Sequence, residues 1–226
     1  MTTRLKNIIT FVALMFLFAA TSVFANEKTY HLTSPDGHIS TSVTVGESIR
    51  YSVSRDGQVL IAPSAVSMRL SDGVVFGRND KVRKVVKTSS DETFPAVAYK
   101  KAEVRDNYNQ ITLLFKEFAL VFRAYDDGVA YRFEGRLGKA KEYEVISEQA
   151  EFDFGKDRMA FVPYVIGLGG KQFDGQFYNS FENTYRLQRL YEWRKDKLAF
   201  LPLAVEAEDG VKVLVTEAGL TNYPGM

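Results

Sequence analysis

The sequence contains no cysteine, which excludes disulfide bonds, thiol nucleophiles and zinc sites with cysteine ligands. It has two histidines, His31 and His38, so a centre of three histidines is also excluded. Neither sign of charge dominates, because the sequence contains 29 Lys and Arg residues and 28 Asp and Glu residues. A formal charge of +1 provides no strong electrostatic field to attract polyanions. We therefore expect no nucleic-acid partner. The 46% of hydrophobic residues predicts a globular chain with a core of its own.

The first 25 residues have the pattern of an export signal. Arg4 and Lys6 precede an almost wholly apolar run over residues 8–20, and small residues up to Ala25 fit a cleavage site. A membrane anchor needs about 20 apolar residues, and this run is shorter and breaks at Thr21. We predict a cleaved signal peptide over residues 1–25. Residues 26–226 then carry 27 basic and 28 acidic groups and form a periplasmic or secreted protein without a membrane span.

The mature chain is dominated by period-two alternation of apolar and polar residues, which is typical of half-buried strands. The clearest case is a hairpin in which residues 118–125 and 129–134 flank the turn Asp126-Asp127-Gly128. Pro63 is expected to break the run that starts at Gln58. Helix and irregular loop remain equal alternatives for residues 185–193. Further strands are predicted at residues 39–45, 49–53, 58–61, 66–70, 110–115, 143–147, 151–154, 158–163, 198–206 and 211–216.

About a dozen short strands without an internal repeat or a proline-rich linker predict a single all-β domain, a large antiparallel β-sandwich over residues 26–226. No second domain is visible in the sequence.

The common catalytic signatures are absent. Residues 167–170 (Gly-Leu-Gly-Gly) lack the lysine spacing of a phosphate-binding loop and are expected to form a surface loop. A Ser-His-Asp triad would have to recruit one of two histidines near the mature terminus. A glycosidase could use paired carboxylates, but the sequence does not set their separations; the late candidates are Glu182, Glu192, Glu206, Glu208 and Glu217.

Residues 163–193 are the most informative segment. Eight aromatic residues, including Tyr178 and Trp193, alternate irregularly with Asn, Gln and Asp. Rings beside amides and carboxylates are typical of sugar-binding surfaces, since sugar C–H faces stack on aromatics while hydroxyls need polar partners. A long loop folded over the sandwich as a satellite core explains the same composition equally well. For Trp193 both roles, stacking on sugar or covering the core, stay open.

Four segments carry a resemblance to a known family. They are residues 34–37 (Ser-Pro-Asp-Gly), 105–109 (Arg-Asp-Asn-Tyr-Asn), the hairpin 122–133 and residues 216–223, which contain a Glu-Ala motif. In this order and spacing the mature chain resembles the amino-terminal domain of glycoside hydrolase family 97. The resemblance implies a super-sandwich like that of galactose mutarotases, followed in the complete enzyme by a (β/α)8 catalytic barrel. It also implies a calcium-dependent α-glucosidase or α-galactosidase that acts on α-linked oligosaccharides.

A barrel needs about 250 residues, so we expect this chain to be a truncated or partial form that lacks the catalytic carboxylates. By its place between Phe181 and Tyr185, Glu182 matches a family glutamate that reaches the barrel and ligates calcium. From the residues alone, Glu182 would be a solvated surface carboxylate. Glu217 belongs to the late motif and is as consistent with a structural role as with a ligand role. Arg123, Arg132 and Asp127 are expected to maintain the hairpin rather than form a site.

Three functions remain as hypotheses. The first is a non-catalytic sandwich domain that packs on the barrel and contributes a carboxylate to its calcium site. The second is a free-standing periplasmic carbohydrate-binding module that uses the aromatic segment. The third is an aldose mutarotase, which needs a well-placed histidine and glutamate; His31 and His38 at one end of the chain argue against it. The sequence does not choose between α-glucoside and α-galactoside or between inversion and retention.

Overall fold

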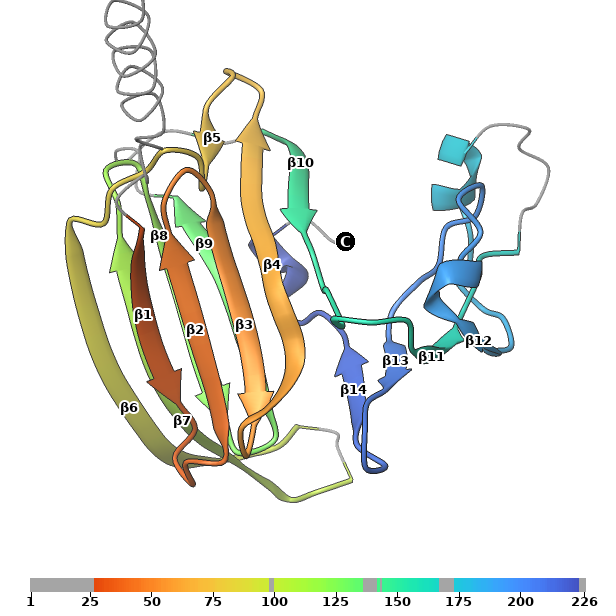
Figure 1. Ribbon diagram of the computed structural model, residues 1–226, viewed down its shortest axis with the longest axis horizontal. Coiled ribbons are helices and arrows are strands. Elements are labelled where there is room, and N and C mark those ends of the chain that lie inside the picture. The colour runs from red at the N-terminus through yellow and green to blue at the C-terminus, as the bar shows by residue number, and fades with distance from the viewer. Residues whose placement is uncertain (1–26, 98–99, 136–141, 143, 167–172, 224–226) are drawn as a thin grey trace, which may run out of the picture.

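The computed structural model describes residues 27–97, 100–135, 142, 144–166 and 173–223. Within these ranges the chain forms antiparallel β-structure with three short 3-10 helices (Figure 1). The elements are β1 (Lys28–Thr33), β2 (Ile39–Val45), β3 (Ile49–Arg55), β4 (Gln58–Leu70), β5 (Val75–Phe76), β6 (Lys84–Pro95), β7 (Glu103–Leu114), β8 (Phe118–Tyr125), β9 (Gly128–Gly135), β10 (Val145–Ala150), β11 (Met159–Val162), η1 (Phe173–Phe177), β12 (Arg186–Arg189), η2 (Leu190–Glu192), β13 (Leu203–Glu206), β14 (Lys212–Val215) and η3 (Leu220–Asn222).

Two facing sheets form the sandwich, as predicted. One has the order β1-β2-β3-β4-β10, with β5 added to β4, and the other has the order β6-β7-β8-β9 (Figure 1). The alternation seen in the sequence places one side of each strand inside. In β2, for example, Ile39, Thr41, Val43 and Val45 are buried while the intervening residues are half-buried. The predicted hairpin of β8 and β9 is confirmed, with Tyr125 opposite Gly128 at its turn.

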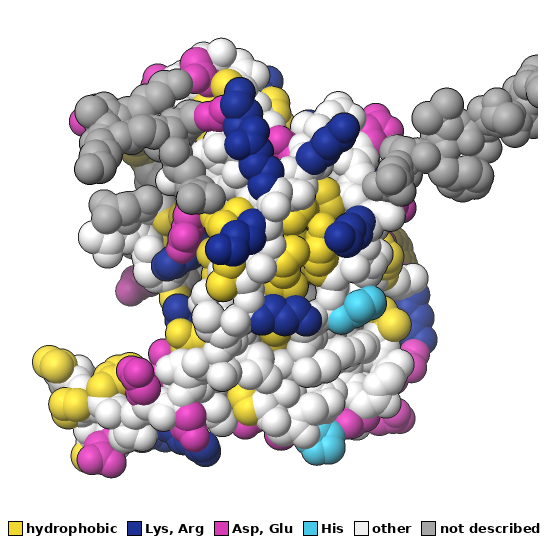
Figure 2. Space-filling model, turned by 90° about the vertical axis from the view of Figure 1, so that its left-hand side faces the viewer, with side chains coloured by type: hydrophobic (Ala, Val, Ile, Leu, Met, Phe, Trp, Pro, Cys, Tyr) yellow, Lys and Arg dark blue, Asp and Glu magenta, His cyan; other side chains and the backbone are white. Residues whose placement is uncertain are grey.

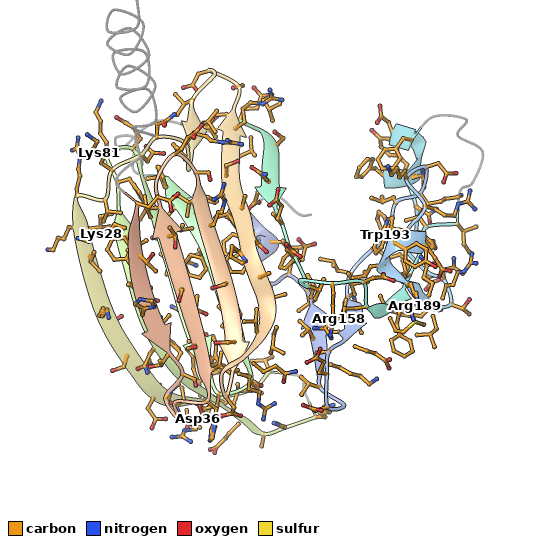
Figure 3. All side chains as sticks on the ribbon, in the orientation of Figure 1. Lys28, Asp36, Lys81, Arg158, Arg189 and Trp193 are labelled. Atoms are coloured by element: carbon orange, nitrogen blue, oxygen red, sulfur yellow. The ribbon has the colours of Figure 1, made fainter. Side chains whose placement is uncertain are left out.

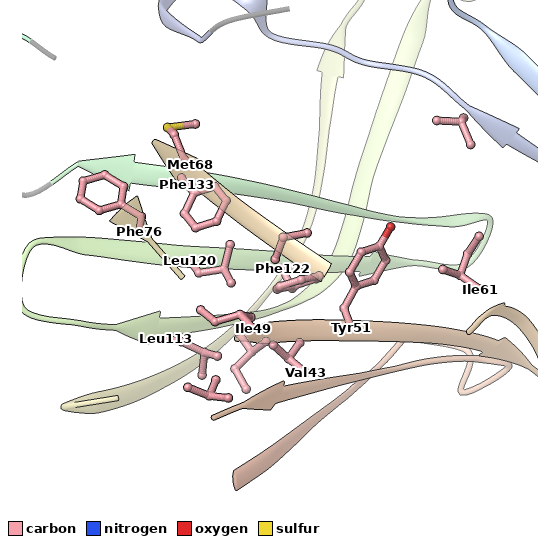
Figure 4. Packing of buried hydrophobic residues seen from close by; sticks show 14 of the residues in the cluster. Val43, Ile49, Tyr51, Ile61, Met68, Phe76, Leu113, Leu120, Phe122 and Phe133 are labelled. Carbon is pink, nitrogen blue, oxygen red and sulfur yellow. The ribbon is translucent and has the colours of Figure 1, made fainter. Parts of the chain in front are cut away.

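Aromatic side chains fill the space between the sheets (Figure 4). Phe118 stacks on Phe76 with ring centres 4.6 Å apart, and Phe122 lies 5.8 Å from the ring of Tyr51. Phe122 is fully buried. Burying such a ring contributes about 2 to 3 kcal/mol, so a row of them gives the sandwich a core independent of any partner.

Pro63 does not break its strand, contrary to prediction. Strand β4 runs through it, because the register shifts so that Ala62 and Pro63 lie together opposite Ser52 of β3. A bulge leaves one residue unpaired, and proline has no N–H to pair. The N–H of Ala62 bonds instead to the carbonyl of Asp153, 2.7 Å away.

A smaller sheet of order β12-β11-β13-β14 stands beside the sandwich (Figure 1). Its buried residues Ala160, Val162 and Val205 belong to the same continuous core cluster as the sandwich residues. Several predictions for this part were wrong in detail. Residues 151–154 form no strand, the predicted strand 198–206 is reduced to β13, and residues 185–193 are neither helix nor loop throughout but β12 followed by η2.

The predicted signal peptide and the glycine-rich stretch 167–170 lie outside the described residues. In the described part of the chain, no helix is both long and apolar enough to cross a bilayer.

Candidate functional site

The loop between η1 and β12 carries Glu182, the predicted calcium ligand. Its backbone is held by neighbouring amides: Asn179 accepts the N–H of Phe181 at 3.2 Å, and the side chain of Asn183 donates to the carbonyl oxygen of Tyr164 at 2.7 Å. Phe181 adopts a left-handed φ of 54°. Glu182 itself is exposed, and its carboxylate has no hydrogen bond to the described residues. A fixed backbone therefore presents a free carboxylate.

Buried polar and aromatic contacts support this loop from behind. The ring of Phe200 lies between those of Phe181 and Tyr185, with ring centres 6.3 and 6.4 Å apart. The side chain of Gln176 is buried; it donates to the carbonyl oxygen of Asp196 and accepts the N–H of Leu198, both at 2.9 Å. These contacts fasten the segment to residues 196–200, which precede β13, so its shape is defined by the fold.

The two alternatives for the aromatic segment each hold for different rings. Trp193 is partly buried and packs edge-on against Tyr164, with ring centres 5.8 Å apart, so it covers the core. The hydroxyl of Tyr164 accepts the side-chain N–H of Gln188 at 3.0 Å. In contrast, Tyr178 is 87% exposed and Tyr191 is 72% exposed. Part of the segment is a satellite core and part is an open aromatic surface.

The other late carboxylates are engaged locally. Glu192 accepts the N–H of Arg189 at 3.0 Å, and Glu206 lies 2.6 Å from the ammonium of Lys212. Glu208 pairs with Lys156, which lowers the pKa of that carboxyl. Within the described ranges no three His, Asp or Glu residues are arranged to hold a metal ion.

Glu217 lies near a carboxylate that the sequence did not single out. Glu148 on β10 accepts a hydrogen bond from the hydroxyl of Tyr223 at 2.9 Å, and that hydroxyl also faces the N–H of Phe133 at 3.4 Å. Burial, opposed by the bond from Tyr223, raises the pKa of Glu148, and the charge of Glu217 raises it further. The segment that contains the late Glu-Ala motif thus ends on the sandwich, where Tyr223 bonds to Glu148 of β10. Only the pairing of distant segments reveals this cluster.

The two arginines of the signature hairpin, Arg123 and Arg132, bond within their own sheet. Arg123 donates to Gln110 at 2.8 Å and stacks over the ring of Tyr108 at 4.0 Å, and Arg132 donates to Glu134 at 2.7 Å. These contacts agree with a role in maintaining the fold.

The described residues thus define an all-β domain, a β-sandwich with a small sheet attached to it. The sequence model described as Glycosyl-hydrolase 97 N-terminal matches residues 32–226. The chain belongs to this family and corresponds to its amino-terminal β-sandwich domain, which confirms the predicted family and fold class.

Similar proteins agree with this assignment. A retaining alpha-galactosidase of Bacteroides thetaiotaomicron is 43% identical over 201 residues, which cover 88% of this chain and 30% of that protein. A Glycoside Hydrolase Family 97 enzyme from Pseudoalteromonas sp. strain K8, solved with panose, superposes with a TM-score of 0.70 at 22% identity; the match covers 86% of this chain and 29% of that one. A beta-arabinopyranosidase structure gives a TM-score of 0.68 at 21% identity, covering 84% and 31%. The chain thus spans about a third of its relatives' length.

Proposed function

We propose that this domain packs on the (β/α)8 catalytic barrel of a calcium-dependent α-glycosidase and presents Glu182 to a calcium site at the junction. The complete protein would be periplasmic or secreted and would act on α-linked oligosaccharides. The observation that carries the proposal is the free carboxylate of Glu182 on a loop whose backbone is fastened by Asn179 and Asn183. Family membership supplies the catalytic partner.

An apolar row across the small sheet supports packing against another domain. Leu187, Phe161, Ala204 and Leu214 are cross-strand neighbours on β12, β11, β13 and β14. Leu187 is 54% exposed and Leu214 is 61% exposed, whereas the opposite side of the sheet is buried in the core. A large apolar surface of this kind is typical of an interface. The row and the Glu182 loop belong to the same small sheet and its connections.

The chemistry of the donor fits one side of a shared calcium site. Calcium takes six to eight oxygen ligands, commonly carboxylates. At this loop the available donor is the carboxylate of Glu182. The side-chain amide of Asn183 beside it already bonds to backbone groups at both its nitrogen and its oxygen. The remaining oxygens would come from the barrel, and a bound ion would supply positive charge at the domain junction.

The proposal is tested in the full-length glycosidase that carries this domain. Glu182→Gln keeps the size and removes the charge, so calcium affinity measured by titration calorimetry should fall at least tenfold, together with hydrolysis of p-nitrophenyl α-galactoside and α-glucoside. Glu192→Gln is the control, because its carboxylate only caps the N–H of Arg189. Equal calcium affinity in wild type and Glu182→Gln, or equal loss in both variants, would overturn the assignment. The isolated chain should hydrolyse neither substrate.

A free-standing carbohydrate-binding module is the second candidate, favoured by the exposed rings of Tyr178 and Tyr191. Solvent-facing aromatic rings can stack on sugar faces. This function requires that the purified chain alone binds α-linked oligosaccharides and that Tyr178→Ala with Tyr191→Ala abolishes the binding. Binding that survives both substitutions would contradict it.

A further inference from the structure

The open side of the sandwich between β1 and β6 carries a second distinctive surface. These strands are the edges of the two facing sheets. Val85 and Lys87 on β6 pair with the buried residues Leu113 and Ile111 on β7, so both lie on the core side of their sheet. The ammonium of Lys87 donates to the carbonyl oxygen of His31 on β1 at 3.2 Å. An inward charge of this kind protects a sheet edge from pairing with another chain, so Lys87 has a structural role.

Further cations gather where β6 begins, and the pairing of Lys84 with Leu114 places both on the face of the sheet opposite to that of Val85 and Lys87. Arg83, Lys84 and Lys116 line a hollow of about 440 Å³, together with Leu114 and Phe115. Figure 2 shows dark-blue basic side chains around a yellow apolar strip on this face, and Figure 3 places Lys28 and Lys81 along the same edge. The basic edge is defined as Lys28, Lys81, Arg83, Lys84, Lys87 and Lys116.

Most of these cations are not paired with a carboxylate among the residues that the structure describes. Lys116 lies 3.2 Å from the carboxylate of the next residue. Among the described residues, no carboxylate lies within 4.0 Å of the side-chain nitrogens of Lys81, Arg83 or Lys84, although all three are exposed. The carboxylate of Asp80 accepts two backbone N–H groups at 2.9 and 3.2 Å instead. The surface therefore has excess positive charge beside an apolar wall.

We propose that the basic edge binds an anionic saccharide, one whose hydroxyls carry sulfate or phosphate esters. A guanidinium and ammonium groups bind such oxyanions strongly, and Leu114 offers an apolar wall for the C–H face of the sugar. A lipid surface would meet a flat basic face rather than a hollow, and a polynucleotide would need a wider positive field than the nearly neutral chain supplies.

This site is separate from the proposed calcium site. Figure 3 places Lys28 and Lys81 on the far edge of the sandwich from Trp193, which follows η2. The inference goes beyond the proposed function, and its test needs no calcium. Glu182→Gln should leave saccharide binding at the basic edge unchanged, so failure of one proposal is distinguishable from failure of the other.

The test is titration calorimetry of the purified chain with sucrose octasulfate, glucose 6-phosphate, unsubstituted sucrose and inorganic sulfate. We expect binding of at least one ester, with affinity that falls as salt rises, and no binding of sucrose. The double variant Arg83→Gln with Lys84→Gln should bind at least tenfold more weakly, and Lys84→Arg should keep wild-type affinity. Lys195→Gln is the matched control, because Lys195 is exposed on the small sheet side.

Which ester binds identifies the source of the oxyanion as a sulfated or a phosphorylated sugar. The proposal is overturned by equal affinity in wild type and the double variant with an unchanged circular dichroism spectrum. It is also overturned if Lys195→Gln weakens binding as much, or if inorganic sulfate binds as tightly as the esters, which would indicate an adventitious ion only. Binding of anionic vesicles or DNA without binding of either ester would assign the surface to another class of ligand and refute the proposal.

Discussion

Removing the hydroxyl of Tyr223 should weaken the contact between the end of the described chain and the sandwich and make the stability of the domain more dependent on pH. In Tyr223→Phe, Glu148 loses a hydrogen bond of 2.9 Å and the N–H of Phe133 loses a longer one of 3.4 Å. The ring remains to fill its place against the core. The change therefore isolates the polar contact from packing.

The expected cost follows from these two bonds. A hydrogen bond to a charged group contributes about 1.5 to 3 kcal/mol, and the long bond contributes less. We expect a loss of about 2 kcal/mol in the free energy of unfolding, or about 4 to 8 °C in melting temperature for a chain of this size.

The dependence on pH has a definite sign. Burial raises the pKa of Glu148 and the bond from Tyr223 lowers it, so the substitution raises that pKa further. A carboxyl with a raised folded-state pKa contributes stability below its unfolded pKa and loses it as pH rises through the folded value. Urea unfolding followed by circular dichroism should therefore show a larger loss at pH 7 than at pH 4. An equal loss at both pH values, or none at pH 7, would refute the reasoning; Glu148→Gln in the same background should remove the pH dependence.

Three further outcomes follow from local geometry. Gly77→Ala should lower the stability of the domain more than Gly37→Ala in thermal melts. Both glycines have a left-handed φ, which costs an alanine about 1 to 2 kcal/mol, but only at position 77 would the added Cβ lie 2.7 Å from a backbone oxygen. The hydrogen bond to Asp56 and the charge of Asp56 raise the pKa of His38. The pair therefore stabilises the fold at acidic pH, and this contribution is lost as pH rises through the raised pKa. An NMR titration of Asp56→Asn should show a lower pKa for His38. Phe122→Ala should cost about 3 to 5 kcal/mol in urea unfolding, since the ring is fully buried, and a loss below 1 kcal/mol would contradict the core assignment.

The sandwich was largely predictable where strands alternate between water and core. The hairpin of β8 and β9 is such a case. Strand β6 was missed because it lies at a sheet edge and is exposed along most of its length, so its residues 84–95 show no clean apolar period. Pro63 was misjudged because a bulge depends on the register of the neighbouring strand, which local sequence does not specify.

The candidate site was predictable only in part. Glu182 was singled out by its place in a family motif, and the structure leaves it exposed, as the residue alone would suggest. The contact between Glu148 and Tyr223 joins residues 75 positions apart, so no local pattern could indicate it. The basic edge was hidden because its cations come from separate segments of a chain with almost no net charge.

The small sheet is formed by a segment of the chain that is held to the sandwich by a hydrogen bond at each end. It leaves after Glu151, whose carbonyl oxygen accepts the hydroxyl of Tyr51, and returns at Tyr223. Ala160, Val162 and Val205 belong to the common core and must be kept. Doubling the length of a flexible loop costs only about 0.6 kcal/mol, so the exposed connections between the strands of the small sheet can be lengthened without disturbing the sandwich register. Changes confined to these connections therefore alter the surface of the small sheet and leave the pairing of the sandwich strands intact.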